Sequence, residues 1–159
     1  MASRTVAHSR IQRSLAIAIG GRRRCKPCRF YGSVLKIDIA CTYRYLAGEV
    51  VRSPTPRNAT TIPDLFVIFE VLSDSTALTD LITKNQEYAA VPSVCHYIVL
   101  SQDEMADTMF ERIGVDWVGH LLRADSILRL PEIDIEVPLA ELYDGIDFSS
   151  DGSNSPALA

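Results

Sequence analysis

Hydrophobic positions near the start of the chain repeat with a helical period. In the segment 6–19, Ile11, Leu15, Ala16 and Ile19 fall on one stripe, and a Gly-Gly pair follows directly. Residues at these spacings share one face of an α-helix, and glycine commonly ends a helix. The pattern predicts an amphipathic helix over this segment, with arginines on its outer face.

A nearly continuous apolar run, LFVIFEVL, extends from Leu65 to Leu72, and Glu70 is its only charge. Such a run is typical of a central strand covered on both faces. The SDST segment that follows offers N-caps for a helix from about Ala77 to Ala90, and VCHYIVL then reads as another buried strand. The unit 65–100 is therefore predicted to be a right-handed parallel crossover.

The flanking segments alternate between strand and turn patterns. Aromatic and β-branched residues in 28–51 predict two or three strands, and the proline-containing segment 52–63 predicts a loop. After residue 100, TMFERIG, DWVGHLL and SILRL predict a meander of strands, and VPLAELYDG a short helix closed by Gly145. We expect a mixed α/β fold with a central mixed sheet flanked by helices. It would form one domain over 1–146, with a disordered tail at 147–159.

Charge is distributed unevenly along the chain. Residues 1–37 hold nine of the 16 Lys and Arg and no acid, although the net charge of the whole chain is −4. This basic start has three interpretations: an organellar targeting segment, a surface that binds the phosphates of DNA, or a solvated basic helix and loop. No apolar run reaches the roughly 18 residues that a membrane span requires, so no membrane partner is expected.

Cysteine and histidine spacing gives no indication of a metal site. The chain has four cysteines, and its one C-x-x-C, Cys25 and Cys28, lacks the second ligand pair of a structural zinc site. Without a hydrophobic signal segment, reduced thiols and a cytoplasmic location are expected. His8 and His96 have no partner at metal-ligand spacing, so both are interpreted as packing or surface residues.

Glu70 is the strongest candidate for chemistry, because a carboxylate in a buried strand is costly unless it is paired or binds a cation. Lys84 follows fourteen residues later on the predicted return helix, four residues after Asp80. A helix that folds back over the strand end could bring Lys84 to Glu70. Metal-dependent phosphodiester hydrolysis needs carboxylates to hold Mg²⁺ and a cation to stabilise the developing charge.

These residues carry a resemblance to a known family. The block EVLS-ST, followed by Asp80, Lys84 and Tyr88, resembles the Uma-type putative restriction endonuclease family of the PD-(D/E)XK nuclease superfamily. The likeness extends over about residues 6–146. It implies a restriction-endonuclease-like fold, DNA as substrate, Mg²⁺ or Mn²⁺ as cofactor, and often a homodimer. It also implies that Glu70 is a metal ligand and that Lys84 is the catalytic lysine.

The sequence departs from the family pattern at the second metal ligand. Leu46 and Ala47 stand where the family usually has Pro-Asp, and the acidic-glycine hairpin before the first helix is missing, as expected of a shortened copy. Glu49 is the candidate substitute. It lies two residues beyond Ala47, so in a regular strand it shares that face at a distance of about 6.6 Å.

Three functions are therefore open. The chain could be a metal-dependent DNA endonuclease in which Glu70 and Glu49 hold the metal, Lys84 stabilises the attacked phosphate and water is the nucleophile. It could instead be a catalytically inactive DNA-binding or scaffold protein with the nuclease fold, which the alanine at position 47 favours. The third hypothesis is a protein unrelated to nucleic acid whose basic start is a targeting segment.

Overall fold

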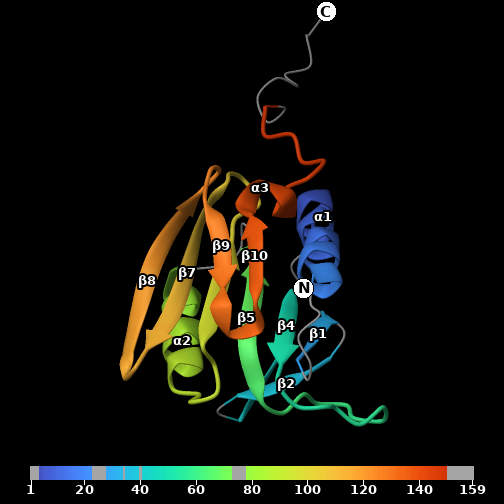
Figure 1. Ribbon diagram of the computed structural model, residues 1–159, viewed down its shortest axis with the longest axis vertical. Coiled ribbons are helices and arrows are strands. Elements are labelled where there is room, and N and C mark those ends of the chain that lie inside the picture. Colours follow the sequence, from blue (N-terminus) through green and yellow to red (C-terminus); the bar gives the residue numbers. More distant parts are fainter. Residues whose placement is uncertain (1–3, 23–27, 34, 40, 73–77, 150–159) are drawn as a thin grey trace, which may run out of the picture.

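A six-stranded sheet forms the centre of the fold in the computed structural model, which describes residues 4–22, 28–33, 35–39, 41–72 and 78–149 (Figure 1). Its strand order is β1-β4-β5-β6-β7-β8. The β5–β6 pair is parallel and the other neighbours are antiparallel, which confirms the predicted mixed sheet. The bounds are β1 Arg29–Gly32, β4 Gly48–Val51, β5 Leu65–Val71, β6 His96–Leu100, β7 Ala106–Ile113 and β8 Asp116–Arg123.

Two small hairpins and the helices complete the described fold. One hairpin pairs β9 with β10 across the short 3-10 helix η2, and the other pairs β2 with β3. The remaining bounds are α1 Val6–Leu15, η1 Ala16–Gly20, β2 Ile37–Ile39, β3 Thr42–Arg44, α2 Leu78–Ala89, β9 Ile127–Leu130, η2 Pro131–Ile133, β10 Ile135–Pro138 and α3 Leu139–Leu142. None of the helices in these described ranges is long and apolar enough to cross a membrane.

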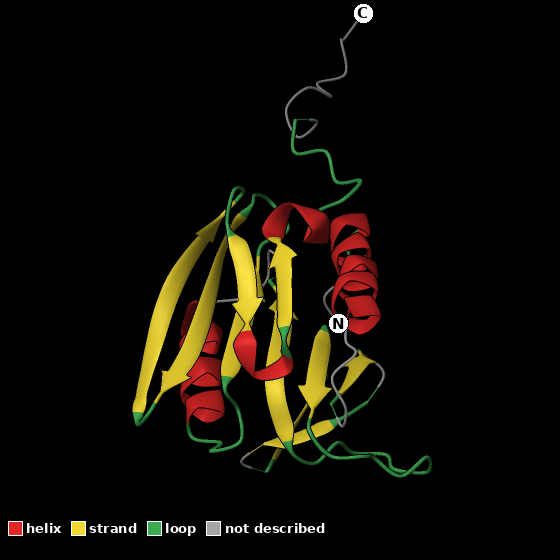
Figure 2. Cartoon of the chain, in the orientation of Figure 1, coloured by secondary structure: helices red, strands yellow, loops and turns green. Residues whose placement is uncertain are grey.

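The two faces of the sheet carry separate hydrophobic clusters. Because side chains alternate along a strand, Val67 and Phe69 of β5 pack with α1, β9, β10 and α3, whereas Ile68 packs toward Tyr88 of α2. Figures 1 and 2 show α2 on one side of the sheet, and α1 with the β9–β10 hairpin on the other. Glu70 has the parity of Ile68, so its side chain faces α2.

Most of the predicted elements are confirmed. The first helix extends as α1 and then as one π-helical turn, η1, and the 65–100 segment forms β5, α2 and a parallel β6. The predicted N-caps in 73–76 lie outside the described residues. Four strands rather than two or three lie between positions 28 and 51.

The predicted meander was wrong in its last strand. β6, β7 and β8 are antiparallel neighbours, but β9 leaves the sheet and pairs with β10, a strand that the sequence analysis did not predict. The chain reverses through η2 and Asp134, whose φ of 54° places it in the left-handed region. At the predicted tail, the ring of Phe148 lies 5.6 Å from that of Tyr143, and residues 150–159 lie outside the described part.

Candidate active site

Glu70 lies near the end of β5 and is held by two tyrosines. Its Oε1 accepts a hydrogen bond of 2.7 Å from Tyr88 of α2, and its Oε2 accepts one of 2.9 Å from Tyr97 of β6. Burial, together with the Glu70 carboxylate, raises the pKa of both tyrosines far above the ordinary value. Both hydroxyls therefore remain protonated donors that fix the orientation of the carboxylate.

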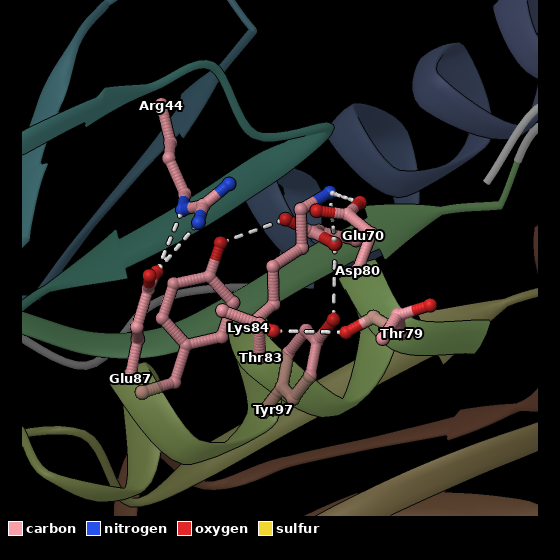
Figure 3. Close-up of polar contacts among 9 residues, drawn as sticks. Arg44, Glu70, Thr79, Asp80, Thr83, Lys84, Glu87 and Tyr97 are labelled. Atoms are coloured by element: carbon pink, nitrogen blue, oxygen red, sulfur yellow. Dashed lines mark hydrogen bonds and ion pairs between the residues drawn. The ribbon is translucent and has the colours of Figure 1, made fainter. Parts of the chain in front are cut away.

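Lys84 reaches the same carboxylate from α2. Its Nζ lies 3.4 Å from Glu70 Oε2 and 3.1 Å from Asp80 Oδ2, so one ammonium bridges a buried and a half-exposed carboxylate (Figure 3). The structure thus brings Glu70 and Lys84 together. One turn after Lys84, Glu87 of α2 pairs with Arg44 of β3, whose guanidinium lies 2.6 Å from Glu87 Oε2. This ion pair helps to orient α2.

The Glu70 carboxylate and Lys84 line a small pocket of about 90 Å³. Three segments complete its wall: the residues just before β4, the end of β5, and one side of α1 with the residue two positions before that helix. The lining residues are Arg4, His8, Gln12, Tyr45, Leu46, Ala47, Glu70, Val71 and Lys84. Ala47 therefore lines the same pocket as Glu70.

The contribution of the first helix was missed by the sequence analysis. Arg4, His8 and Gln12 are spaced by four residues, a signal for one helical face, and all three line the pocket. The helix begins beside the pocket, where Thr5 caps it by accepting a hydrogen bond from the His8 N–H. Burial, and then the neighbouring Arg4, lowers the pKa of His8, so this imidazole is neutral near pH 7.

Glu49, the predicted second metal ligand, is on the same face of the sheet as Glu70. It lies opposite Ile68 in the β4–β5 register, has no solvent exposure, and is not among the residues that line the Glu70 pocket. Neither carboxylate oxygen has a hydrogen-bond partner among the described residues. Burial raises the pKa of Glu49 to about 8, so the carboxyl is protonated at neutral pH in the metal-free protein.

We expect Tyr88→Phe and Tyr97→Phe each to lower the free energy of unfolding by about 1.5–3 kcal/mol, because each removes a hydrogen bond to a charged carboxylate in the core. Urea titration followed by Trp117 fluorescence would measure this. Tyr43→Phe is the matched control, because Tyr43 is largely exposed and should change stability by less than about 0.5 kcal/mol. A similarly small effect at Tyr88 would show that its hydroxyl does not compensate the buried charge.

A second polar cluster lies on the opposite face of the sheet. His96, Glu111 and Glu132 place one potential ligand atom each within 4.8 Å of one another, so the described part of the chain contains an acidic and histidine group that could hold a metal ion. The sequence interpretation of His96 as a packing residue missed this group, because its partners are distant in the chain.

A central mixed sheet whose buried strand carboxylate faces a lysine on the next helix is the arrangement expected of the restriction-endonuclease-like class. Residues 1–136 match the model of the Uma2 family, described as "Putative restriction endonuclease". The chain belongs to this family, which confirms the resemblance seen in the sequence.

A solved structure supports the same fold. The crystal structure of a putative nuclease belonging to DUF820 from Anabaena variabilis is similar with a TM-score of 0.66, 14% sequence identity, and coverage of 87% of this chain and 81% of that chain. At this identity the likeness concerns the fold alone. No curated protein sequence matches the chain.

Proposed function

We propose that this protein is a metal-dependent DNA endonuclease that hydrolyses phosphodiester bonds at the Glu70–Lys84 pocket. The observation that carries the proposal is the 3.4 Å approach of Lys84 Nζ to Glu70 Oε2 at the wall of a polar pocket. A carboxylate and an ammonium at this distance provide the two groups that phosphodiester hydrolysis needs, a cation ligand and a stabiliser of negative charge.

The pocket residues fit a hard divalent cation. Mg²⁺ is usually bound through one or two carboxylates, and waters and substrate phosphate complete its oxygen ligands. The pocket supplies one carboxylate, Glu70, and its volume of about 90 Å³ has room for several waters. When bound, Mg²⁺ or Mn²⁺ would neutralise phosphate charge and lower the pKa of an attacking water.

The protein's own side chains would position and stabilise the reacting groups. Tyr88 and Tyr97 orient the Glu70 carboxylate through their hydroxyls. Lys84 would donate hydrogen bonds to the non-bridging oxygens of the attacked phosphate, where negative charge develops. Asp80, 3.1 Å from Lys84 Nζ, keeps the ammonium near the pocket when substrate is absent.

Charge at the pocket favours a phosphate substrate. Arg4 lines the wall, and α1 begins beside it, so the positive end of the helix dipole lies near the pocket. Farther along, Arg10 of α1 donates to the Gly145 carbonyl, and Arg22, two residues after η1, pairs with Glu141. We infer that DNA approaches the pocket from the side of Arg4. We also propose a cytoplasmic location, and a homodimer as the family resemblance implies.

A second candidate is a catalytically inactive protein that binds DNA through the same fold. Ala47 favours it, because this residue lines the pocket where a second carboxylate would complete the metal site. The role of Glu49 as that second ligand stays a prediction, which the metal titration below addresses.

The proposal is tested by calorimetric titration of Mg²⁺ and Mn²⁺ and by nicking of supercoiled plasmid. We expect Glu70→Ala to abolish metal binding in the pocket and Lys84→Ala to slow nicking by about 100- to 1,000-fold, as for loss of one transition-state donor. Lys36→Ala is the matched control, because Lys36 lies over the exposed Tyr43 ring and does not line the pocket.

Each outcome separates the candidates. Metal binding that is lost in Glu70→Ala and kept in Glu49→Ala would assign the ion to Glu70 without Glu49. Nicking that survives Lys84→Ala unchanged would remove the proposed chemistry. DNA binding without metal binding or nicking would establish the inactive protein instead.

A further inference from the structure

His96 is a buried imidazole whose polar atoms are not satisfied. It begins β6, has no solvent exposure, and neither ring nitrogen has a hydrogen-bond partner among the residues that the structure describes. Its Nε2 faces two carboxylates, at 3.8 Å from Glu111 Oε1 and 3.7 Å from Glu132 Oε2. These separations exceed the roughly 3.2 Å limit of an ordinary N–H···O hydrogen bond.

This arrangement is unfavourable without a cation. A buried polar atom with no partner costs about 1–3 kcal/mol. The Glu111 and Glu132 carboxylates converge on one nitrogen, so their like charges also repel each other. A metal ion bound to all three ligand atoms would satisfy the nitrogen and offset both negative charges.

We propose that His96 Nε2, Glu111 and Glu132 form a binding site for a transition-metal divalent cation of the Zn²⁺ class. An imidazole nitrogen with two carboxylates is a donor set for Zn²⁺ or its first-row neighbours, whereas Ca²⁺ and Mg²⁺ prefer oxygen ligands alone. Three protein ligands leave a fourth position for water.

The two separations from His96 Nε2 are close to those of a tetrahedral site, and all three ligand atoms lie within 4.8 Å of one another. Ligand atoms about 2.0–2.1 Å from one ion lie roughly 3.3–3.4 Å apart at the tetrahedral angle. The distances of 3.7 and 3.8 Å therefore need to shorten by only a few tenths of an ångström. Glu111 and Glu132 can move this far, because their side chains are 26% and 34% exposed.

His120 supports the proposed ligand geometry. Its Nε2 lies 3.1 Å from Glu111 Oε2, the carboxylate oxygen that does not face His96. Hydrogen bonds of this kind orient metal-ligating carboxylates. His120 also lines an open hollow of about 460 Å³ on this face of the sheet.

The site would join three elements that are distant in the chain. His96 and Glu111 are directly opposed in the β6–β7 register, so they share a face of the sheet, and Glu132 comes from η2. Figure 1 shows the β9–η2–β10 unit lying in front of the central sheet. A bound ion would pin this unit to β6 and β7.

The proposed site is separate from the nuclease pocket. Tyr97 follows His96 directly and donates its hydrogen bond to Glu70 on the α2 side, so the two sites lie on opposite faces of the sheet. The inference does not rest on the proposed function. Glu70→Gln protein can therefore be used as the host for the test, because the pocket carboxylate is then absent.

Zn²⁺ calorimetry and the visible absorption spectrum of the Co²⁺-loaded full chain test the proposal. We expect one equivalent to bind in both the natural and Glu70→Gln chains, with an intense Co²⁺ band of four- or five-coordination and a higher Tm with Zn²⁺. Glu132→Gln and Glu111→Gln should each weaken binding by about 100-fold or more, since each removes a direct ligand, and losing only a hydrogen-bond partner of a ligand already costs 10–100-fold.

Glu136→Gln is the matched control. Glu136 lies on β10 of the same unit, is exposed and pairs with Arg129, so its loss should leave Zn²⁺ affinity unchanged. His96→Ala should also abolish binding. If this buried variant fails to fold, the Glu111→Gln and Glu132→Gln variants, at partly exposed positions, still decide the test. No stoichiometric binding, or binding that survives Glu111→Gln and Glu132→Gln, would overturn the proposal.

Discussion

Ala47→Asp is expected to bind Mg²⁺ at least about tenfold more tightly than the natural chain and to nick plasmid DNA about 100-fold faster. Ala47 and Glu70 line the same pocket, so the substitution places a second carboxylate beside the first. Mg²⁺ binds more strongly as oxygen ligands with negative charge are added. A more firmly placed ion then contributes several kcal/mol to the stabilisation of the transition state.

The neutral variant Ala47→Asn is the control, because it has nearly the same size and no charge. We expect Ala47→Asp to be less stable than Ala47→Asn in EDTA, since position 47 is only 6% exposed and an unpaired charge there is costly. Added Mg²⁺ should reverse the order of their Tm values. Equal Mg²⁺ affinities for the two variants would show that this position does not face a metal site.

Glu49→Gln should remove the contribution of Glu49 to the pH dependence of stability between about pH 4.5 and pH 8. Burial raises the pKa of Glu49 from 4.5 to about 8 in the folded chain. In this interval the folded chain keeps a proton that the unfolded chain releases. The contribution of Glu49 to stability is therefore full below about pH 4.5, falls as the pH rises, and is lost above about pH 8.

Between pH 4.5 and pH 8 the free energy of unfolding of the natural chain should fall by roughly 3–5 kcal/mol relative to that of the Glu49→Gln chain. Each pKa unit of the Glu49 shift corresponds to about 1.4 kcal/mol. Urea unfolding at several pH values gives this difference directly. Glu136→Gln, at an exposed site, should keep the natural pH profile. Parallel profiles for Glu49→Gln and the natural chain would show that Glu49 is ionised in the folded state.

The part of the fold that could be predicted is the part specified by neighbouring residues. The apolar run of β5, the helical spacing of α2 and the β-branched β6 each give a local signal, and their order fixes a parallel crossover. Glu70 stands out because it is the only charge in its strand, and Lys84 because it lies on the helix that folds back.

The remainder depends on contacts between distant segments. β10 has four residues with alternating burial, too few to distinguish from a loop before β9 is known to pair with it. His96 has no ligand at short spacing, since Glu111 comes from the next strand and Glu132 from η2. Arg4 and His8 reach the pocket only because α1 packs against the sheet beside the end of β5.

The partners of Glu70 have a consequence for how such sequences change over time. Tyr88, Lys84 and Tyr97 all come from the continuous β5–α2–β6 unit. The buried charge is therefore compensated as soon as this local unit forms, and the loss of any partner penalises folding directly. Ala47 lies outside the unit and carries no such penalty. While Glu70 is present, selection for a folded chain thus favours keeping Lys84 and both tyrosines, even in a descendant that has ceased to cut DNA.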